Sequence, residues 1–275
     1  AAAIYASGGW EEILTNLATQ DPTLINLFAV SANGGQAIII IASFLAIGLP
    51  LLGMPQLLVR FISARDDGEI KKARIVSSLV LLVLTFGAVT VGVAGRALFP
   101  GLEDPENIFP VISNNLFPQI ISGMLLVVVL SAIMSTVDSL LLLVSSSIIR
   151  DTYQKILKSS KDEKTLANYG KYVTIFIGLI AVLAAVQEPR VIFDFVLLSW
   201  SGLGSAFGPV IIGILYNKKI TWKGVFAGMS GGFLASTIWV AWFKADYYGL
   251  YEAIPGFIVG LILTFGVSWL TSQKK

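Results

Sequence analysis

A row of hydroxyl groups inside a long apolar run is the feature of this sequence best suited to chemistry. Residues 122–153 read SGMLLVVVLSAIMSTVDSLLLLVSSSIIRDTY. At 100° per residue, a helix places Ala132, Ser135, Thr136 and Ser139 on one face. A polar stripe on a helix in lipid must face protein or water, so this face is expected to point into the protein.

The oxygens of this stripe suit a sodium ion. Sodium is a hard cation that needs roughly five or six oxygen ligands, and hydroxyls with a neighbouring carbonyl supply them without a full charge. Ser135 and Thr136 would offer hydroxyls, and Ala132 its carbonyl. The same hydroxyls can instead bond to carbonyls of their own helix or hold neighbouring helices together. The stripe alone does not separate these interpretations.

Two carboxylates occur in apolar surroundings. Asp138 lies inside the same run, where a carboxylate costs roughly 2.5–3.5 kcal/mol on insertion scales. It therefore requires a cation, a proton or a hydrogen-bond donor. Asp194 is closer to the end of its apolar run, and we expect solvent to reach it.

A cluster of glycine and proline interrupts the first apolar run. Residues 48–55 contain two of each. Pro50 and Pro55 lack an amide and collide with the carbonyl four residues earlier, which would free the acceptors of Ala46 and Leu51. We expect a broken helix, as in many secondary transporters, where exposed backbone groups meet ions and zwitterions. A proline kink satisfied by neighbouring side chains is the alternative.

The surrounding composition is that of a membrane protein. The chain is 55% hydrophobic and 13% charged, against roughly 25% charged in soluble domains. Seven stretches approach the length of a spanning helix, and the fourth is the shortest: 36–54, 76–99, 119–148, 172–187, 191–216, 224–243 and 253–270.

Basic residues predict how these helices are oriented. Alternate loops hold sixteen of the 19 Lys and Arg, in four places: Arg60, Arg65, Lys71, Lys72 and Arg74; Arg150, Lys155, Lys158, Lys161, Lys164 and Lys171; Lys218, Lys219 and Lys223; Lys274 and Lys275. The positive-inside rule then predicts an outside N-terminus and a cytoplasmic C-terminus. Seven crossings agree with that parity.

Small residues and one long loop complete the helical pattern. Glycines four residues apart, suited to close helix packing in lipid, occur at Gly224, Gly228 and Gly232, at Gly204 and Gly208, and at Gly256 and Gly260.

The outer loop at 100–118 is rich in Pro and Asn and is expected to form a short surface or re-entrant helix, with a role as an external gate.

The composition also excludes several functions. The chain has no Cys and no His, which removes disulfides and the commonest general base and metal ligands, so an enzyme is not expected. A net charge of +2 with scattered basic clusters predicts no nucleic-acid partner. The first residues lack the features of a secretory signal, and the chain is expected to begin within a longer protein.

Several motifs resemble the sodium/solute symporter family, and most closely its sodium/proline symporters. Residues 131–153 resemble the family signature, in which a hydroxyl pair is followed by a second Ser group and an acidic and aromatic end. GMPQLLVRF at 53–61, WSGLGSAFGPV at 200–210 and GLYEAIPGF at 249–257 resemble further segments in the same order. The resemblance covers nearly the whole chain from about residue 36.

The resemblance implies an all-α integral membrane protein with the second inverted repeat of a leucine-transporter-type fold. Residues 1–35 would be an extracellular loop, 36–216 the second five-helix repeat, and 217–275 two accessory helices with a short cytoplasmic tail. The partners implied are the lipid bilayer, a small solute and the N-terminal half of the same transporter.

The resemblance also implies where ions bind. Ala132, through its carbonyl, and Ser135 and Thr136 match the family's sodium ligands. Asp138 and Ser139 match hydroxyls that hold a second sodium in some members, here with a carboxylate that suits sodium or a proton.

The solute site is implied on the broken helix. Sodium/proline symporters have a Trp and a Tyr there, where this chain has Ile47 and Leu51; Gly48 and Gly53 complete the candidate set. The expected function is sodium-coupled symport of proline or a related amino acid. A pantothenate-like acid, another small solute, and a non-transporting seven-helix receptor or sensor are the alternatives.

Overall fold

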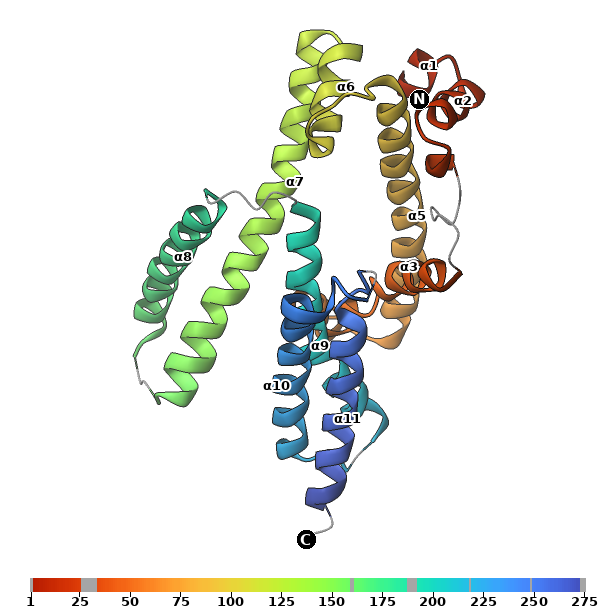
Figure 1. Cartoon of the computed structure of the whole chain (residues 1–275). Helices are drawn as coiled ribbons and strands as arrows, with labels where there is room; N and C mark the ends of the chain where they lie inside the picture. The colour runs from red at the N-terminus through yellow and green to blue at the C-terminus, as the bar shows by residue number, and fades with distance from the viewer. Residues whose placement is uncertain are drawn as a thin grey trace. The chain divides into compact units, whose positions relative to one another are not determined.

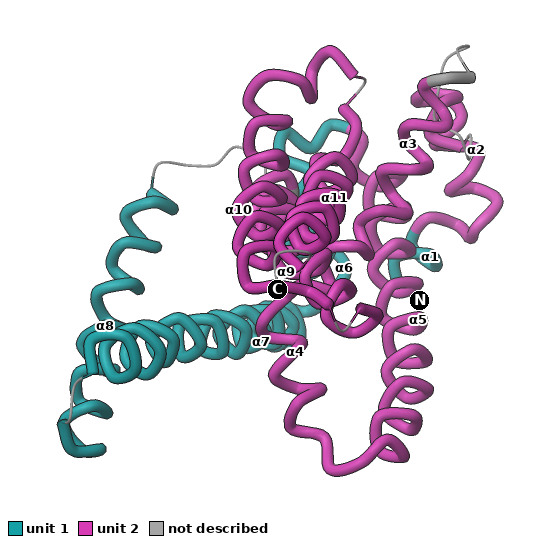
Figure 2. The backbone as a smooth tube through the Cα atoms, turned by 90° about the horizontal axis from the view of Figure 1, so that it is seen from below, with its two compact units in different colours: residues 1–6, 101–190 teal, residues 7–100, 191–275 magenta. Residues whose placement is uncertain are grey.

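A computed structural model describes residues 2–25, 34–158, 161–186, 192–217, 219–247 and 249–272. These residues form helices and turns, with no β-strand among them (Figure 1). They divide into two compact units, shown in Figure 2: unit 1 comprises residues 1–6 and 101–190, and unit 2 comprises residues 7–100 and 191–275. The all-α class predicted from the sequence is confirmed.

Unit 1 contains two long helices and several short ones. Its elements are α1 (Ala2–Ala6), η3 (Pro105–Asn107), α6 (Ile108–Leu116), α7 (Gln119–Ser146), the π-helical η4 (Ser147–Ile156) that prolongs α7, and α8 (Glu163–Ala185). The short helix α6 confirms the helix expected within residues 100–118. Its role as a gate stays a prediction.

Unit 2 contains the interrupted helix and the C-terminal helices. Its elements are α2 (Trp10–Gln20), η1 (Pro22–Ile25), α3 (Gly34–Ala46), η2 (Pro50–Gly53), α4 (Pro55–Ile62), α5 (Asp67–Leu98), α9 (Ile192–Tyr216), α10 (Trp222–Ile238), the π-helical η5 (Trp239–Phe243) and α11 (Ala253–Ser272).

Among the residues that the structure describes, seven helical segments are long and apolar enough to cross a membrane, and they match the seven predicted stretches. They are Gln36–Gly53, Asp67–Leu98, Gln119–Ile156, Glu163–Ala185, Asp194–Tyr216, Trp222–Phe243 and Ala253–Ser272. The prediction that the fourth is the shortest is wrong, since it has 23 residues and the first has 18. The fourth extends further toward its N-terminus than the apolar run because polar residues form its first two turns.

Polar caps decide where three of these helices begin. Asp66, Asp162 and Thr221 precede α5, α8 and α10, and each side chain accepts a hydrogen bond from the backbone N–H three residues later, at 2.8, 3.4 and 3.3 Å. Such caps satisfy N–H groups that have no partner within the helix. The caps therefore start each helix at the charged loop that precedes its apolar run.

Glycines allow α10 and α11 to pack closely. A Cβ placed on Gly228 would lie 1.9 Å from Oγ1 of Thr264, and one on Gly224 would lie 1.9 Å from Oγ of Ser268. Both positions are buried, as are the two hydroxyl residues. Lipid tails are as apolar as the side chains, so helices in a membrane gain most from such close contact. The packing role predicted for these glycines is confirmed.

Candidate functional site

The first spanning segment is broken, as the sequence predicts. Helix α3 ends at Ala46, the 3-10 turn η2 covers Pro50–Gly53, and α4 begins at Pro55. One detail of the expectation is wrong: the carbonyl of Ala46 is not free, because it accepts a hydrogen bond from the backbone N–H of Leu49 at 2.9 Å. A tight turn thus replaces the helical bond that Pro50 cannot donate.

Two glycines of α9 hold the broken segment. A Cβ on Gly204 would lie 2.2 Å from Cα of Pro50, and a Cβ on Gly53 would lie 2.8 Å from the carbonyl oxygen of Gly204 and 2.5 Å from the backbone nitrogen of Gly208. The nearest atoms are backbone atoms, which cannot rotate away as side chains do. The close approach of η2 to α9 therefore requires glycine at these positions.

The four candidate solute residues do not share one environment. Ile47 is half-buried, Gly48 and Leu51 are exposed, and Gly53 is buried against α9. Gly53 thus has a clear packing role, and its part in solute binding stays a prediction. Ile47 is the member of this set that lines a cavity.

That cavity has a volume of about 210 Å³ and lies where α3, α9 and the segment before α11 meet. Its walls combine apolar with charged and polar groups. The polar lining residues are Ser43, Asp194, Lys244 and Tyr251. A small cavity with a few polar groups among apolar ones is the usual form of a site for a small molecule.

Hydrogen bonds fix the wall of this cavity. Tyr251 donates its hydroxyl to the carbonyl of Leu197 at 3.2 Å, and its backbone N–H donates to Oγ of Ser43 at 3.0 Å. Burial, with a smaller contribution from the neighbouring Glu252, raises the pKa of Tyr251 above its ordinary value. The hydroxyl therefore remains a donor, and Tyr251 ties α3 to α9.

A buried ion pair lies beside the cavity. Glu252 is fully buried, and its Oε2 lies 3.0 Å from Nζ of Lys244, at an angle outside that of a hydrogen bond. The hydroxyl of Ser201 donates to Oε1 at 3.4 Å. A buried charge needs such compensation. Lys244 therefore compensates the buried carboxylate from the edge of the cavity, and the exposed Asp194 adds an acidic group to the lining.

Sequence reasoning singled out Asp194 only as a carboxylate that solvent reaches, and it missed Ser43, Lys244 and Tyr251. None of the four was predicted to line a cavity. The available signal was Lys244, a single basic residue in a loop predicted to lie outside. An isolated charge at the end of an apolar helix indicates a specific partner. Only the fold brings that loop next to α3.

The hydroxyl stripe lies on α7, in unit 1. Thr136 donates to the carbonyl of Ala132 at 3.1 Å, and Ser139 donates to that of Ser135 at 2.9 Å. All four residues are exposed. A hydroxyl that donates its proton keeps lone pairs to accept a cation. A hydrogen bond within the helix is thus compatible with sodium binding by the same hydroxyl. The oxygens of Ala132 and Thr136, 3.1 Å apart, are close enough to ligate one ion.

Asp138 is also exposed on α7, and it forms no hydrogen bond or ion pair with a residue that the structure describes. The carboxylate is therefore available to an ion, a proton or another protein segment. Its proposed role beside Ser139 stays a prediction. The stripe belongs to unit 1 and the broken helix to unit 2.

Comparison with known proteins agrees with these features. The model of the sodium:solute symporter family matches residues 1–232. The chain belongs to this family. It is therefore a multi-pass membrane protein from a family of transporters, and not an enzyme.

Its relatives include sodium/proline symporters of Staphylococcus aureus, among them those of strains JH9 and Newman. Each is 37% identical over 270 residues, which are 94% of this chain and 52% of the relative. The chain thus spans about half the length of these relatives. No solved structure matches it.

Proposed function

We propose that this chain forms the second half of a sodium-coupled symporter for proline or a related amino acid. The observation that carries the proposal is the broken helix packed on the glycines of α9, in a member of a symporter family. Broken helices provide ion and solute sites in many secondary transporters. The relatives' names supply proline as the nearest solute.

In this proposal, sodium binds the α7 stripe through the carbonyl of Ala132 and the hydroxyls of Ser135 and Thr136. Asp138 and Ser139 form a second site for sodium or a proton. The solute binds along the broken helix at Ile47, Gly48, Leu51 and Gly53. Sodium moving down its gradient then drives solute uptake by alternating access, without covalent chemistry.

Two residues of the broken helix favour a second candidate solute, one other than proline. Ile47 and Leu51 replace the Trp and Tyr of the proline pattern, and aliphatic side chains lack both the aromatic faces and the polar tips of those residues. Uptake by the full-length transporter of labelled proline, other amino acids and pantothenate, with and without sodium, separates these solutes. Sodium-independent accumulation of every solute would refute the coupling.

The sodium ligands are tested by Ser135→Ala and Thr136→Ala. Each should raise the sodium concentration for half-maximal uptake, by an amount equivalent to about 1–3 kcal/mol for a lost polar contact. Thr90→Ala is a matched control, because Thr90 also donates to the carbonyl four residues earlier, at 2.7 Å, without being a predicted ligand. Equal sodium dependence in all three variants would leave the stripe with a packing role.

The proposed domain organisation is tested separately. The N-terminal half is proposed to complete the sodium site and to provide the bundle against which this chain moves. Liposomes that contain this chain alone, under an inward sodium gradient, should therefore accumulate no solute, whereas co-expression with the upstream half should restore uptake. Saturable accumulation by the chain alone would contradict this organisation.

A further inference from the structure

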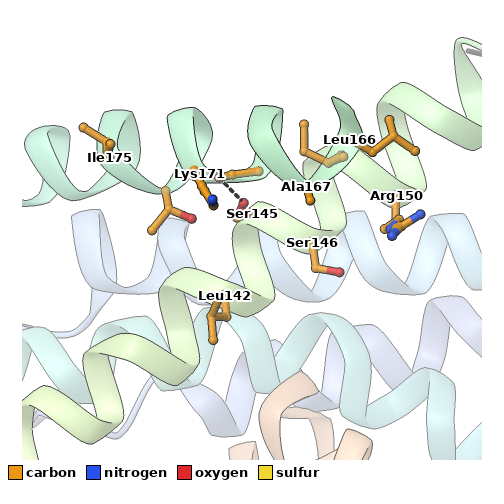
Figure 3. Close-up of a pocket in the computed structure, with 11 residues that line it drawn as sticks. Leu142, Ser145, Ser146, Arg150, Leu166, Ala167, Lys171 and Ile175 are labelled. Carbon is orange, nitrogen blue, oxygen red and sulfur yellow. Dashed lines mark hydrogen bonds between the residues drawn. The ribbon is translucent and has the colours of Figure 1, made fainter. Parts of the chain in front are cut away.

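A cavity of about 560 Å³ lies between two parts of unit 1. Helix α7 and its continuation η4 form one wall, and α8 forms the other. Leu142, Ser146 and Arg150 line it from one side, and Lys171 and Ile175 from the other (Figure 3). Thr174 of α8 also lines it. It lies within unit 1 and includes none of the proposed sodium ligands. Its chemistry is therefore distinct from the transport site.

Direct contacts hold the two helices together around this cavity. The hydroxyl of Ser145 donates to the carbonyl of Gly170 at 2.8 Å, a bond drawn in Figure 3. Nη1 of Arg150 donates to Oε1 of Glu163 at 2.9 Å. The cavity is consequently a fixed part of the pair, bounded by a hydrogen bond and an ion pair.

Two cations line the cavity, and Lys171 is the one without an ion pair to a described residue. Glu163 offsets the charge of Arg150 through their ion pair. Lys171 is exposed, lines the cavity and forms no ion pair with any residue in the described ranges. With the hydroxyl of Thr174, three residues later on the same helix, it provides a positive charge and hydrogen-bond donors, the groups that bind a phosphodiester.

Basic and apolar side chains share the lining of the cavity, with Leu142 and Ile175 beyond Lys171 and with Leu166 beside Arg150 (Figure 3). Arg150 is eight residues, or about 12 Å, from Leu142 along the helix. Leu142 and Ile175 are 57% and 60% exposed, as expected of side chains beside lipid tails. Lys171 directly precedes the apolar part of α8, and the loop between the helices belongs to a basic cluster. The pattern is that of a site for a headgroup with its acyl chain.

We propose that this cavity binds a singly charged anionic phospholipid from the cytoplasmic leaflet. Lys171 and the hydroxyl of Thr174 hold the phosphate, Arg150 borders the headgroup, and an acyl chain lies along Leu142 and Ile175. Basic cavities between membrane helices on the cytoplasmic side are suited to such headgroups. Lys171, the lining cation without an ion pair to a described residue, matches the single charge of a monoanionic lipid.

The test is lipid binding by the purified full-length transporter, measured by native mass spectrometry during titration with phosphatidylglycerol or phosphatidylcholine. Phosphatidylglycerol should bind more tightly. Lys171→Gln should weaken its binding by about fivefold, the effect of one lysine near a lipid surface. Lys164→Gln, an exposed control on the same helix that does not line the cavity, should change binding by less than about twofold.

A second variant tests the cavity without changing its charge. Thr174→Trp should fill the space and displace the lipid, with the protein still folded as judged by its elution as a single species. Equal loss of binding in Lys171→Gln and Lys164→Gln would overturn the proposal in favour of general surface attraction. Inorganic phosphate that competes as well as the lipid would exclude an acyl site. Equal binding of phosphatidylglycerol and phosphatidylcholine would overturn the proposal, and would indicate that another segment of the full-length transporter fills the cavity.

Discussion

Replacing Gly204 by alanine should separate the broken helix from α9. The new Cβ would lie 2.2 Å from Cα of Pro50 and 3.0 Å from its carbonyl carbon. Carbon atoms in contact prefer about 3.5–4.0 Å. The two backbones must therefore move apart by more than about 1 Å, because no side-chain rotation relieves a clash with the backbone of Pro50.

The size of the effect follows from two opposing contributions. Overpacking of a close contact costs typically about 1–3 kcal/mol. Alanine in place of a helical glycine stabilises the folded helix by about 0.5–1 kcal/mol, which offsets part of this cost. The net loss should be about 1–2 kcal/mol. For a protein of this size each kcal/mol lowers the melting temperature by about 2–4 °C.

The assay is thermal unfolding of the purified chain in detergent, followed by tryptophan fluorescence. Gly204→Ala should lower the melting temperature by about 2–8 °C. Gly266→Ala is the matched control, because a Cβ there meets no atom within 4 Å and the residue also lies in a spanning helix of unit 2. If both variants unfold at the same temperature, the close approach of η2 to α9 is refuted.

Three further predictions concern charge. Asp138→Asn should alter the pH dependence of uptake or its ion coupling, with the protein still present at its normal level. If transport is unchanged at every pH, the carboxylate has only a structural role. Single-cysteine labelling of intact cells should reach Asn107→Cys and not Lys161→Cys, and external labelling of the latter would overturn the topology. Glu252→Gln should destabilise the chain by about 1–3 kcal/mol, since it leaves Lys244 unpaired. The double variant Glu252→Gln with Lys244→Met should recover much of this stability in thermal unfolding, and a further loss would contradict the pairing.

The sequence by itself determined the membrane class, the seven helices and the position of the helix break. Each depends on local chemistry. About 20 apolar residues suffice to define a spanning helix, and a proline lacks its amide in any surroundings. The glycines spaced by four in α10 likewise indicated close packing, because only small residues permit it in lipid.

The tertiary structure decided which residues meet. The ion pair of Lys244 with Glu252, and the contact of Tyr251 with Ser43 across 208 positions, join segments whose sequences contain no sign of one another. The same holds for the glycines of α9 against Pro50, and for the cavity between α7 and α8. Contacts of this kind depend on how helices are placed in three dimensions, and periodicity along one helix reports only which face is polar or apolar.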